Sequence, residues 1–159
     1  MKYLSTYKSP LGTLVLQSDG LSITAISFDE GDLQGKDNCD LLRECEQQLD
    51  DYFCGRSIGF DLPLDPQGTA FQKKVWNELL HIPGGEPITY SELALRLGDP
   101  KLVRAVGTAN GRNPIAIVIP CHRVIGLGNK LIGYAGGLER KRWLLSHEMK
   151  YHPSKGTLF

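Results

Sequence analysis

The chain has 159 residues, of which 41% are hydrophobic, 8% aromatic and 23% charged, and its formal net charge is zero. A chain of this length can bury most of its foldable surface in one domain, or in one body with two lobes. The composition excludes disordered, collagen-like and disulfide-scaffold classes. No apolar run approaches the roughly 20 residues of a membrane helix, and the N-terminus lacks a signal-peptide pattern. We therefore expect a cytoplasmic protein.

The charges are divided unevenly along the chain. Residues 1–70 carry five Lys/Arg and twelve Asp/Glu, whereas residues 71–159 carry thirteen basic and six acidic residues. These balances of −7 and +7 indicate either that the C-terminal half faces a polyanion or that the two halves attract each other. Charge alone does not decide between the two interpretations.

The first part of the chain predicts a small antiparallel sheet and one helix. Strands are expected at about residues 3–9, 12–18 and 21–28, and a helix at about residues 38–53. Turn residues at 9–12 and the pair Asp19-Gly20 separate the strands. The segment 60–68, rich in Pro, Asp and Gly, is a linker candidate, and we place a domain boundary between residues 65 and 66. The expected domains are therefore 1–65 and 66–159.

The second part of the chain predicts mainly helices. Thr69 and Thr89 each open a capping-box pattern, with Gln72 and Glu92 three residues later. A further helix over about residues 100–110, after Gly98 and a capping Asp99, completes a helix-turn-helix pattern. An ordinary helical hairpin packed in a core is the alternative interpretation.

Residues 115–126 form an apolar, β-branched run that is typical of a buried strand, although Pro120 interrupts it. A glycine-rich loop and a last helix over residues 138–148 follow. In that helix, Leu138, Trp143, Leu144 and Leu145 are expected to face the core, and Arg140 and Lys141 to face water.

The chain has four cysteines: Cys39, Cys45, Cys54 and Cys121. The first three lie in or beside the predicted helix 38–53, where free cysteine is usually a small core residue, and zinc binding is not expected. Cys121 directly precedes His122 and Arg123, and cationic neighbours favour the nucleophilic thiolate. Adjacent side chains of an extended chain point to opposite faces, so contact between thiol and imidazole requires a bend or a bridging water.

Several chemistries fit Cys121 from its neighbours alone. A buried structural cysteine is the plainest interpretation. A phosphatase loop would need arginine at position 127, where Leu127 stands. A thiol hydrolase using His122 and Asn113 stays open, as does alkyl transfer to the thiolate, which needs the least additional apparatus.

The second helix of the helix-turn-helix is unusual for a helix that reads the major groove. It offers one Arg104 among the small residues Ala105, Gly107, Thr108 and Ala109. Small residues allow close approach to the minor groove with little sequence readout. A single arginine there could enter the base stack where a base has been turned out.

Four segments of the C-terminal half carry a resemblance when taken together. They are Arg104-Ala-Val-Gly107, Asn110-Gly-Arg-Asn-Pro114, Ile119-Pro-Cys-His-Arg-Val124 and Gly133-Tyr-Ala-Gly-Gly137. On these segments the chain closely resembles the O6-alkylguanine-DNA alkyltransferases, also called methylated-DNA–protein-cysteine methyltransferases. The resemblance is dense over residues 69–149. It implies an α/β (α+β) fold, with a ribonuclease-H-like antiparallel sheet lobe before a mainly helical lobe with a helix-turn-helix.

The resemblance also implies a role for each site residue. Cys121 would accept the methyl group, His122 would take the thiol proton through a water, and Glu148 would orient His122. Asn113 would hold the turn beside the cysteine, and Tyr90 would donate a proton toward guanine N3. Arg104 would fill the gap left by the flipped base. Further DNA contacts are expected from Ser91, Ala105, Gly107, Thr108 and Arg112, and the pocket would be lined by Tyr134, Ala135 and Gly136.

The expected function is repair of DNA by direct reversal. An alkyl group would move irreversibly from O6 of guanine in double-stranded DNA to Cys121, once per molecule, without metal or other cofactor. Whether O4-alkylthymine is also a substrate stays open, because Ala135 stands where some members have serine. The protein is expected to bind the minor groove as a monomer, with clustering on DNA left open. The rival classes are a thiol hydrolase and a lesion-binding module without transfer activity.

Overall fold

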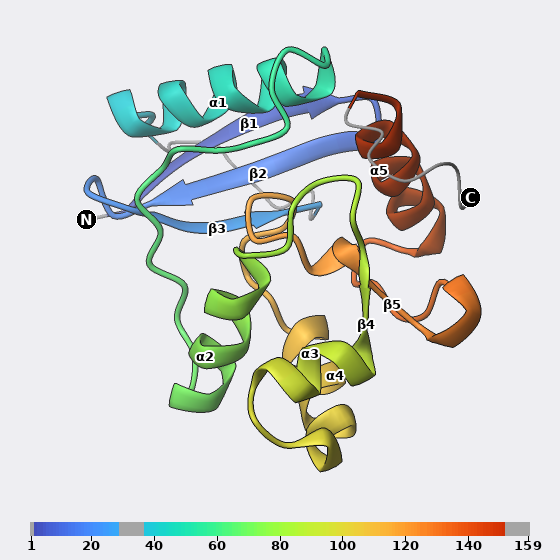
Figure 1. Cartoon of the computed structure of the whole chain (residues 1–159). Helices are drawn as coiled ribbons and strands as arrows, with labels where there is room; N and C mark the ends of the chain where they lie inside the picture. The colour runs from blue at the N-terminus through green and yellow to red at the C-terminus, as the bar shows by residue number, and fades with distance from the viewer. Residues whose placement is uncertain (1, 29–36, 152–159) are drawn as a thin grey trace. The chain divides into compact units, whose positions relative to one another are not determined.

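The computed structural model describes residues 2–28 and 37–151 (Figure 1). Its contacts divide the chain into two compact units. The first holds residues up to Gln67 together with Pro114–Val118, and the second holds Gly68–Asn113 together with residues from Ile119 onward. Within the described residues, no helix is both long and apolar enough to cross a membrane. The fold is mixed α/β, as expected.

The sheet of the first unit has three antiparallel strands in the order β1-β2-β3. They are β1 (Tyr3–Ser9), β2 (Gly12–Ser18) and β3 (Ile23–Ser27). The third strand begins two residues later than its sequence pattern predicts. The cause is the carboxylate of Asp19, which accepts hydrogen bonds from the backbone N–H groups of Leu21 and Ser22 at 2.9 and 2.8 Å and holds them in the turn.

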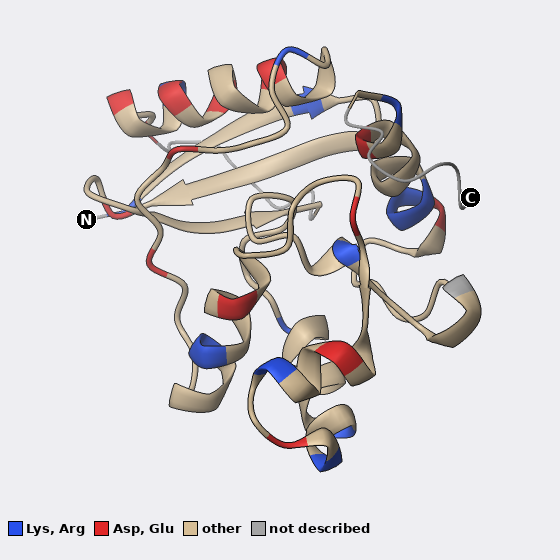
Figure 2. Cartoon of the chain, viewed as in Figure 1, with Lys and Arg blue, Asp and Glu red and all other residues tan. Residues whose placement is uncertain are grey.

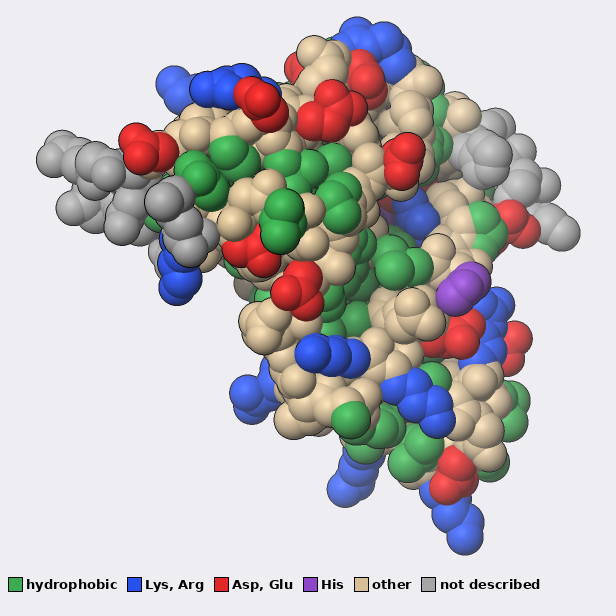
Figure 3. Space-filling view, turned by 90° about the vertical axis from the view of Figure 1, so that its left-hand side faces the viewer, with side chains coloured by type: hydrophobic (Ala, Val, Ile, Leu, Met, Phe, Trp, Pro, Cys, Tyr) green, Lys and Arg blue, Asp and Glu red, His purple; other side chains and the backbone are tan. Residues whose placement is uncertain are grey.

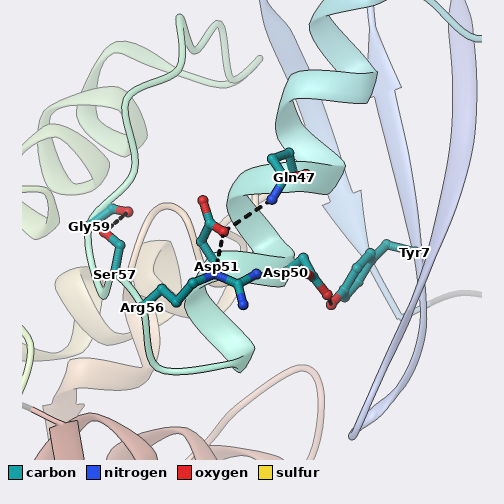
Figure 4. A network of polar contacts seen from close by, with 7 residues as sticks. All are labelled: Tyr7, Gln47, Asp50, Asp51, Arg56, Ser57 and Gly59. Atoms are coloured by element: carbon teal, nitrogen blue, oxygen red, sulfur yellow. Dashed lines mark hydrogen bonds and ion pairs between the residues drawn. The ribbon is translucent and has the colours of Figure 1, made fainter.

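Helix α1 (Asp40–Phe53) packs its apolar face on this sheet (Figure 1). Its buried residues are Leu42, Cys45, Leu49, Tyr52 and Phe53. A polar network closes the end of the helix (Figure 4). The Tyr7 hydroxyl of β1 donates to Asp50 at 3.0 Å, and Arg56 pairs with Asp50 and Asp51. Of the three cysteines expected to be core residues, Cys45 is buried, as predicted, and Cys39 is partly exposed. The expectation is wrong for Cys54, which is exposed because it lies at the C-cap of α1.

The apolar run at residues 115–126, which predicts a buried strand, does not form one continuous strand; only Val124–Ile125 is a strand, β5. The first half of the run belongs to the first unit, where Ile26 donates to the Pro114 carbonyl and accepts from the Ala116 N–H, both at 3.0 Å. Ile117 then adopts a positive φ of 72°, which ends any extended run. The second half of the segment returns to the second unit. A uniformly apolar stretch therefore marks two buried segments in different units instead of one strand.

The second unit begins with helix α2 (Ala70–Leu79), which opens as its sequence predicts. The Thr69 hydroxyl accepts from the Gln72 N–H at 3.1 Å, and the Gln72 side chain accepts from the Thr69 N–H at 2.9 Å. One turn further on, Trp76 is 2% exposed and its indole N–H donates to the Ala109 carbonyl at 2.8 Å. This bond ties α2 to the helix that contains Ala109.

The helix-turn-helix follows a short strand, β4 (Ile88–Thr89). Helix α3 (Tyr90–Arg96) is capped by Thr89, whose hydroxyl accepts from the Glu92 N–H at 3.1 Å. The second helix is divided, because a 3₁₀ turn, η1 (Pro100–Leu102), precedes α4 (Val103–Gly111). Asp99 caps η1, as predicted, by accepting from the Lys101 N–H at 2.9 Å.

The remainder of the second unit carries the catalytic candidates. The 3₁₀ turn η2 (Cys121–Arg123) leads into β5 (Val124–Ile125), which pairs in parallel with β4. A second 3₁₀ turn, η3 (Leu127–Asn129), and a loop precede helix α5 (Leu138–Tyr151).

The predicted orientation of α5 is wrong at two positions. Leu138 is 47% exposed, whereas Lys141 is completely buried. Lys141 is buried because the glycine-rich loop before α5 offers its carbonyls to the ammonium group. Its Nζ donates to Ile132 O at 2.8 Å and to Gly133 O at 3.3 Å.

Candidate active site

Cys121 sits on a turn that neighbouring backbone and one asparagine define. Asn113, at the point where the chain leaves the second unit, donates through Nδ2 to the Ile119 carbonyl at 2.7 Å, where the chain returns. Pro120 precedes the cysteine, and the Pro120 carbonyl accepts from the Arg123 N–H at 3.0 Å. The chain at Cys121 is therefore bent instead of extended. Its side chain is 7% exposed, so the site is almost closed to solvent.

The next residue, His122, is held by a buried carboxylate from α5. His122 Nε2 lies 2.8 Å from Glu148 Oε2, and both side chains have no exposed surface. The other ring nitrogen, Nδ1, is buried and has no hydrogen-bond partner among the described residues. A ring fixed through Nε2 with Nδ1 unpartnered is oriented to accept a proton at Nδ1.

Arg123 supplies the charge that stabilises the Glu148 carboxylate. Its Nε donates to Oε1 at 2.8 Å and its Nη2 to Oε2 at 2.9 Å, which is the bidentate geometry of a strong ion pair. Its Nη1 donates to the Ile82 carbonyl at 2.7 Å. Burial alone would raise the pKa of Glu148, but the contacts with His122 and Arg123 hold it well below its usual range. The carboxylate is thus ionised inside the protein.

The pKa shifts of Cys121 and His122 favour a protonated thiol beside a neutral imidazole. Burial raises the pKa of the Cys121 thiol, while a hydrogen bond from Asn113 and the charge of Lys141 act in the opposite direction. Burial likewise lowers the pKa of His122, against the opposing effect of Glu148. The resting site therefore holds a thiol and a neutral imidazole, and deprotonation of the thiol can be coupled to its reaction.

Tyr90 and Lys141 meet at one backbone carbonyl of the glycine-rich loop. The Tyr90 hydroxyl donates to Ile132 O at 3.0 Å, and Lys141 Nζ donates to the same oxygen at 2.8 Å. The ammonium also lies 5.7 Å from the centre of the Tyr90 ring. These contacts fix the loop that precedes Tyr134, whose hydroxyl is buried and has no hydrogen-bond partner among the described residues.

The site as built is a buried thiol beside an oriented base, and the comparisons with known proteins agree with that chemistry. Residues 70–150 match the family model described as 6-O-methylguanine DNA methyltransferase, DNA binding domain. Residues 2–66 match the model of the ribonuclease-like domain of the same enzymes. The chain belongs to the 6-O-methylguanine DNA methyltransferase family.

Individual members are similar along almost the whole chain. A methylated-DNA–protein-cysteine methyltransferase of Methanosarcina acetivorans is 46% identical over 92% of this chain and 97% of its own length. The crystal structure of the Mycobacterium tuberculosis O6-methylguanine methyltransferase has a TM-score of 0.86 at 41% identity, covering 98% of this chain and 97% of that one. The structure of Mycobacterium tuberculosis OGT in complex with DNA has a TM-score of 0.87 at 44% identity, covering 96% of each chain.

The family match also tests the predicted fold of the N-terminal lobe. The antiparallel sheet with α1 is the region that matches the ribonuclease-like domain, so the predicted fold of the N-terminal lobe is confirmed. The predicted boundary between residues 65 and 66 stays a prediction. The compact units divide after Gln67, and the first also includes residues 114–118.

The residues predicted to contact DNA lie on the exposed side of α3 and α4. Ser91, Arg104, Ala105, Thr108 and Arg112 are all exposed. Gly107 instead faces the Tyr90 ring, since a Cβ at that position would lie 3.9 Å from two ring carbons. Ala135 is exposed and Gly136 partly so, and the Gly136 carbonyl accepts from Arg140 at 3.2 Å. The roles of these residues stay predictions.

Basic side chains gather on the same helices. In Figure 2, Lys and Arg positions are marked on α2, on α3 and in the turn before α4, whereas acidic positions predominate on α1; α2 and α3 each also carry one Glu. In the space-filling view, several basic side chains project from the surface (Figure 3). The exposed bases of α2, α3, η1 and α4 are Lys73, Lys74, Arg96, Lys101 and Arg104. This surface is suited to a polyanion.

Sequence reasoning missed three residues of the buried cluster. Arg123 appeared only as a cation near the thiol, although it pairs with Glu148. The sequence pattern of the last helix predicts that Lys141 faces water, whereas its side chain is buried. Asn110 lies on α4 and is 3% exposed, and its Nδ2 donates to the Cys121 carbonyl at 3.2 Å. The adjacency of Arg123 to Cys121 was a usable signal, whereas the contacts of Lys141 and Asn110 depend on the tertiary fold.

No metal site is apparent in the described part of the chain, where no three His, Cys, Asp or Glu side chains cluster suitably. The absence of a metal or other cofactor stays a prediction.

Proposed function

We propose that this chain removes alkyl groups from O6 of guanine in double-stranded DNA by transferring them to Sγ of Cys121. The chain is a DNA-repair methyltransferase by family, of the class that alkylates a cysteine of its own. The assignment to Cys121 rests mainly on one observation: among the four cysteines, Cys121 stands beside an imidazole that a buried carboxylate orients.

The geometry supports an in-line displacement at the alkyl carbon. The Cys121 thiol loses its proton to His122 Nδ1 through a water molecule as its sulfur attacks. The new S–C bond forms while the C–O6 bond breaks, and the electron pair of the broken bond stays on the base. Tyr90 supplies a proton to guanine N3, so guanine leaves without a negative charge.

Protons then redistribute, so that the proton lost by the thiol is balanced by the one gained by guanine. The alkylated base itself is the donor, which is why the proposed reaction needs no cofactor. The thioether has no route back to a thiol within this chemistry. We therefore expect each molecule to act once.

The exposed face of α3 and α4 is proposed to bind DNA through the minor groove. Helix α4 presents small side chains, which permit its backbone to approach the minor groove closely. Arg104 is the side chain proposed to fill the gap that the flipped base leaves in the base stack. Exposed basic residues on the surrounding helices supply contacts to phosphates. We propose a monomer acting in the cytoplasm; clustering on DNA stays open.

The deciding experiment is the mass of the intact protein and of its peptides after mixing with a duplex that carries one O6-methylguanine. We expect a gain of one methyl group on the Cys121 peptide, saturating at one per chain. The Cys121→Ser variant should bind the duplex without gaining mass. Repeated turnover without a gain in mass would favour a thiol hydrolase, and lesion binding by the wild type without a gain would favour a binding module.

A further inference from the structure

Asn110 presents a buried acceptor that the reaction proposed above does not use. Its side chain is 3% exposed on α4, and its Oδ1 has no hydrogen-bond partner among the described residues. Leaving a buried carbonyl oxygen unpaired is unfavourable, and native proteins rarely do so away from a binding site. We therefore expect Asn110 Oδ1 to accept a hydrogen bond from a bound ligand.

The orientation of the amide is set by its neighbours. A backbone carbonyl only accepts hydrogen bonds, so the atom that lies 3.2 Å from the Cys121 oxygen must be Nδ2. The Asn110 side chain also contacts the Tyr90 hydroxyl: burial raises the pKa of Tyr90, and a hydrogen bond from Asn110 acts in the opposite direction. Both donor contacts are thus made to residues of the proposed reaction centre, Cys121 and Tyr90, and the acceptor Oδ1 of the same amide has no partner among the described residues.

The two candidate lesions differ in what they offer such an acceptor. O6-methylguanine carries an exocyclic amine at C2, whose N–H groups donate hydrogen bonds. O4-methylthymine carries no N–H group on its ring, because alkylation removes the proton of N3. In the proposed reaction, a base that approaches Cys121 with its alkylated oxygen and Tyr90 with N3 comes close to the Asn110 amide, because that amide contacts both residues.

We propose that Asn110 is a specificity-determining residue, whose Oδ1 accepts a hydrogen bond from the 2-amino group of the flipped guanine. This rests on the proposed function and extends it, since it makes O6-alkylguanine the preferred substrate over O4-alkylthymine. Asn110 contributes recognition of the base and takes no part in transfer of the alkyl group.

The test is a double-mutant cycle that pairs Asn110→Leu with removal of the amine from the base. The substrates are duplexes carrying O6-methylguanine or O6-methylhypoxanthine, which lacks only the 2-amino group. Single-turnover rates are measured with saturating protein, so that affinity for the duplex does not enter. We expect the wild type to act about tenfold faster on O6-methylguanine, the effect of one net hydrogen bond. Asn110→Leu should reduce this preference to within about twofold.

A matched control is Thr108→Val on the same helix, whose hydroxyl donates to the Arg104 carbonyl at 3.1 Å on the exposed side. Any change there should fall equally on both bases. Asn110→Ala provides a second variant in case leucine disturbs the fold, and thermal melting checks both. A base preference that is the same in wild type and both variants, or absent from the wild type, would overturn the proposal. Failure of the wild type to demethylate either base would instead overturn the proposed function.

Discussion

Glu148 Oε2 accepts from two side chains that are adjacent in the sequence: His122 Nε2 at 2.8 Å and Arg123 Nη2 at 2.9 Å. The two residues can converge on one carboxylate because they lie in the 3₁₀ turn η2 and not in an extended strand. One charge on α5 thereby orients the proton acceptor and neutralises a buried guanidinium. The arrangement joins catalysis to stability, so loss of this charge should affect both.

Replacing Glu148 with Gln should reduce both stability and the rate of methyl transfer. The variant leaves Arg123 buried without its counter-charge, which costs about 3–5 kcal/mol of the free energy of unfolding. Urea denaturation measures this loss, and single-turnover transfer measures the rate. Asp40→Asn is the control, because its ion pair with Arg43 is exposed to solvent and contributes little to stability. Equal destabilisation by the two variants would contradict the role given to Arg123.

The acid dependence of stability follows from the same carboxylate. Its folded pKa lies well below its unfolded value of 4.5, so the folded state binds fewer protons than the unfolded state. The stabilisation is complete above that unfolded value and is lost as the pH falls toward the folded pKa. The difference in unfolding free energy between wild type and Glu148→Gln should therefore begin to shrink below about pH 4 and continue to shrink as the pH falls further. A difference that is constant from pH 7 to pH 3 would show that folding does not lower the pKa of Glu148.

Gly68 should tolerate no side chain, for a reason that concerns packing alone. A Cβ at this position would lie 2.5 Å from Cη2 of the rigid Trp76 ring and 2.6 Å from the Gln72 side-chain oxygen of the capping box. Gly68→Ala should therefore cost about 1–3 kcal/mol of unfolding free energy. At Gly59, a Cβ would meet nothing within 4 Å, so Gly59→Ala should be neutral within about 0.5 kcal/mol. Denaturant midpoints of the two variants distinguish them.

Local signals in the sequence predicted local structure well, and the limits appear where distant segments meet. Thr69, Thr89 and Asp99 cap their helices as expected, because capping involves residues two or three positions apart. The pairing of His122 with Glu148 was implied by family resemblance, since no periodicity relates residues 26 positions apart. Lys141 was misplaced because the acceptors of its ammonium are carbonyls of a loop, and carbonyls leave no mark in the sequence.

Lys141 should make the free energy of unfolding depend on pH in the alkaline range, because the pKa of its ammonium is lowered by burial. Burial lowers the pKa of its ammonium to about 8, from 10.5. Between these values the unfolded state binds more protons than the folded state, so this residue makes stability rise with pH. Lys141→Met should remove that contribution, and the wild type should gain stability relative to the variant from pH 8 to pH 10.5. If the difference in unfolding free energy between the two proteins is constant across this pH range, the ammonium is not desolvated in the folded state.

Arg104 separates extrusion of the base from the chemistry at Cys121. It is exposed on α4, outside the buried cluster of Cys121, His122 and Glu148. Arg104→Ala should therefore slow repair of O6-methylguanine in a duplex by about tenfold or more, since flipping costs a few kcal/mol without a residue to fill the stack. Attack on free O6-benzylguanine, which needs no flipping, should change by less than about twofold. Single-turnover rates on the two substrates provide the comparison, with Lys101→Ala as a control for loss of one positive charge on the same surface. An equal loss on both substrates would show that Arg104 supports the pocket instead of the extruded state.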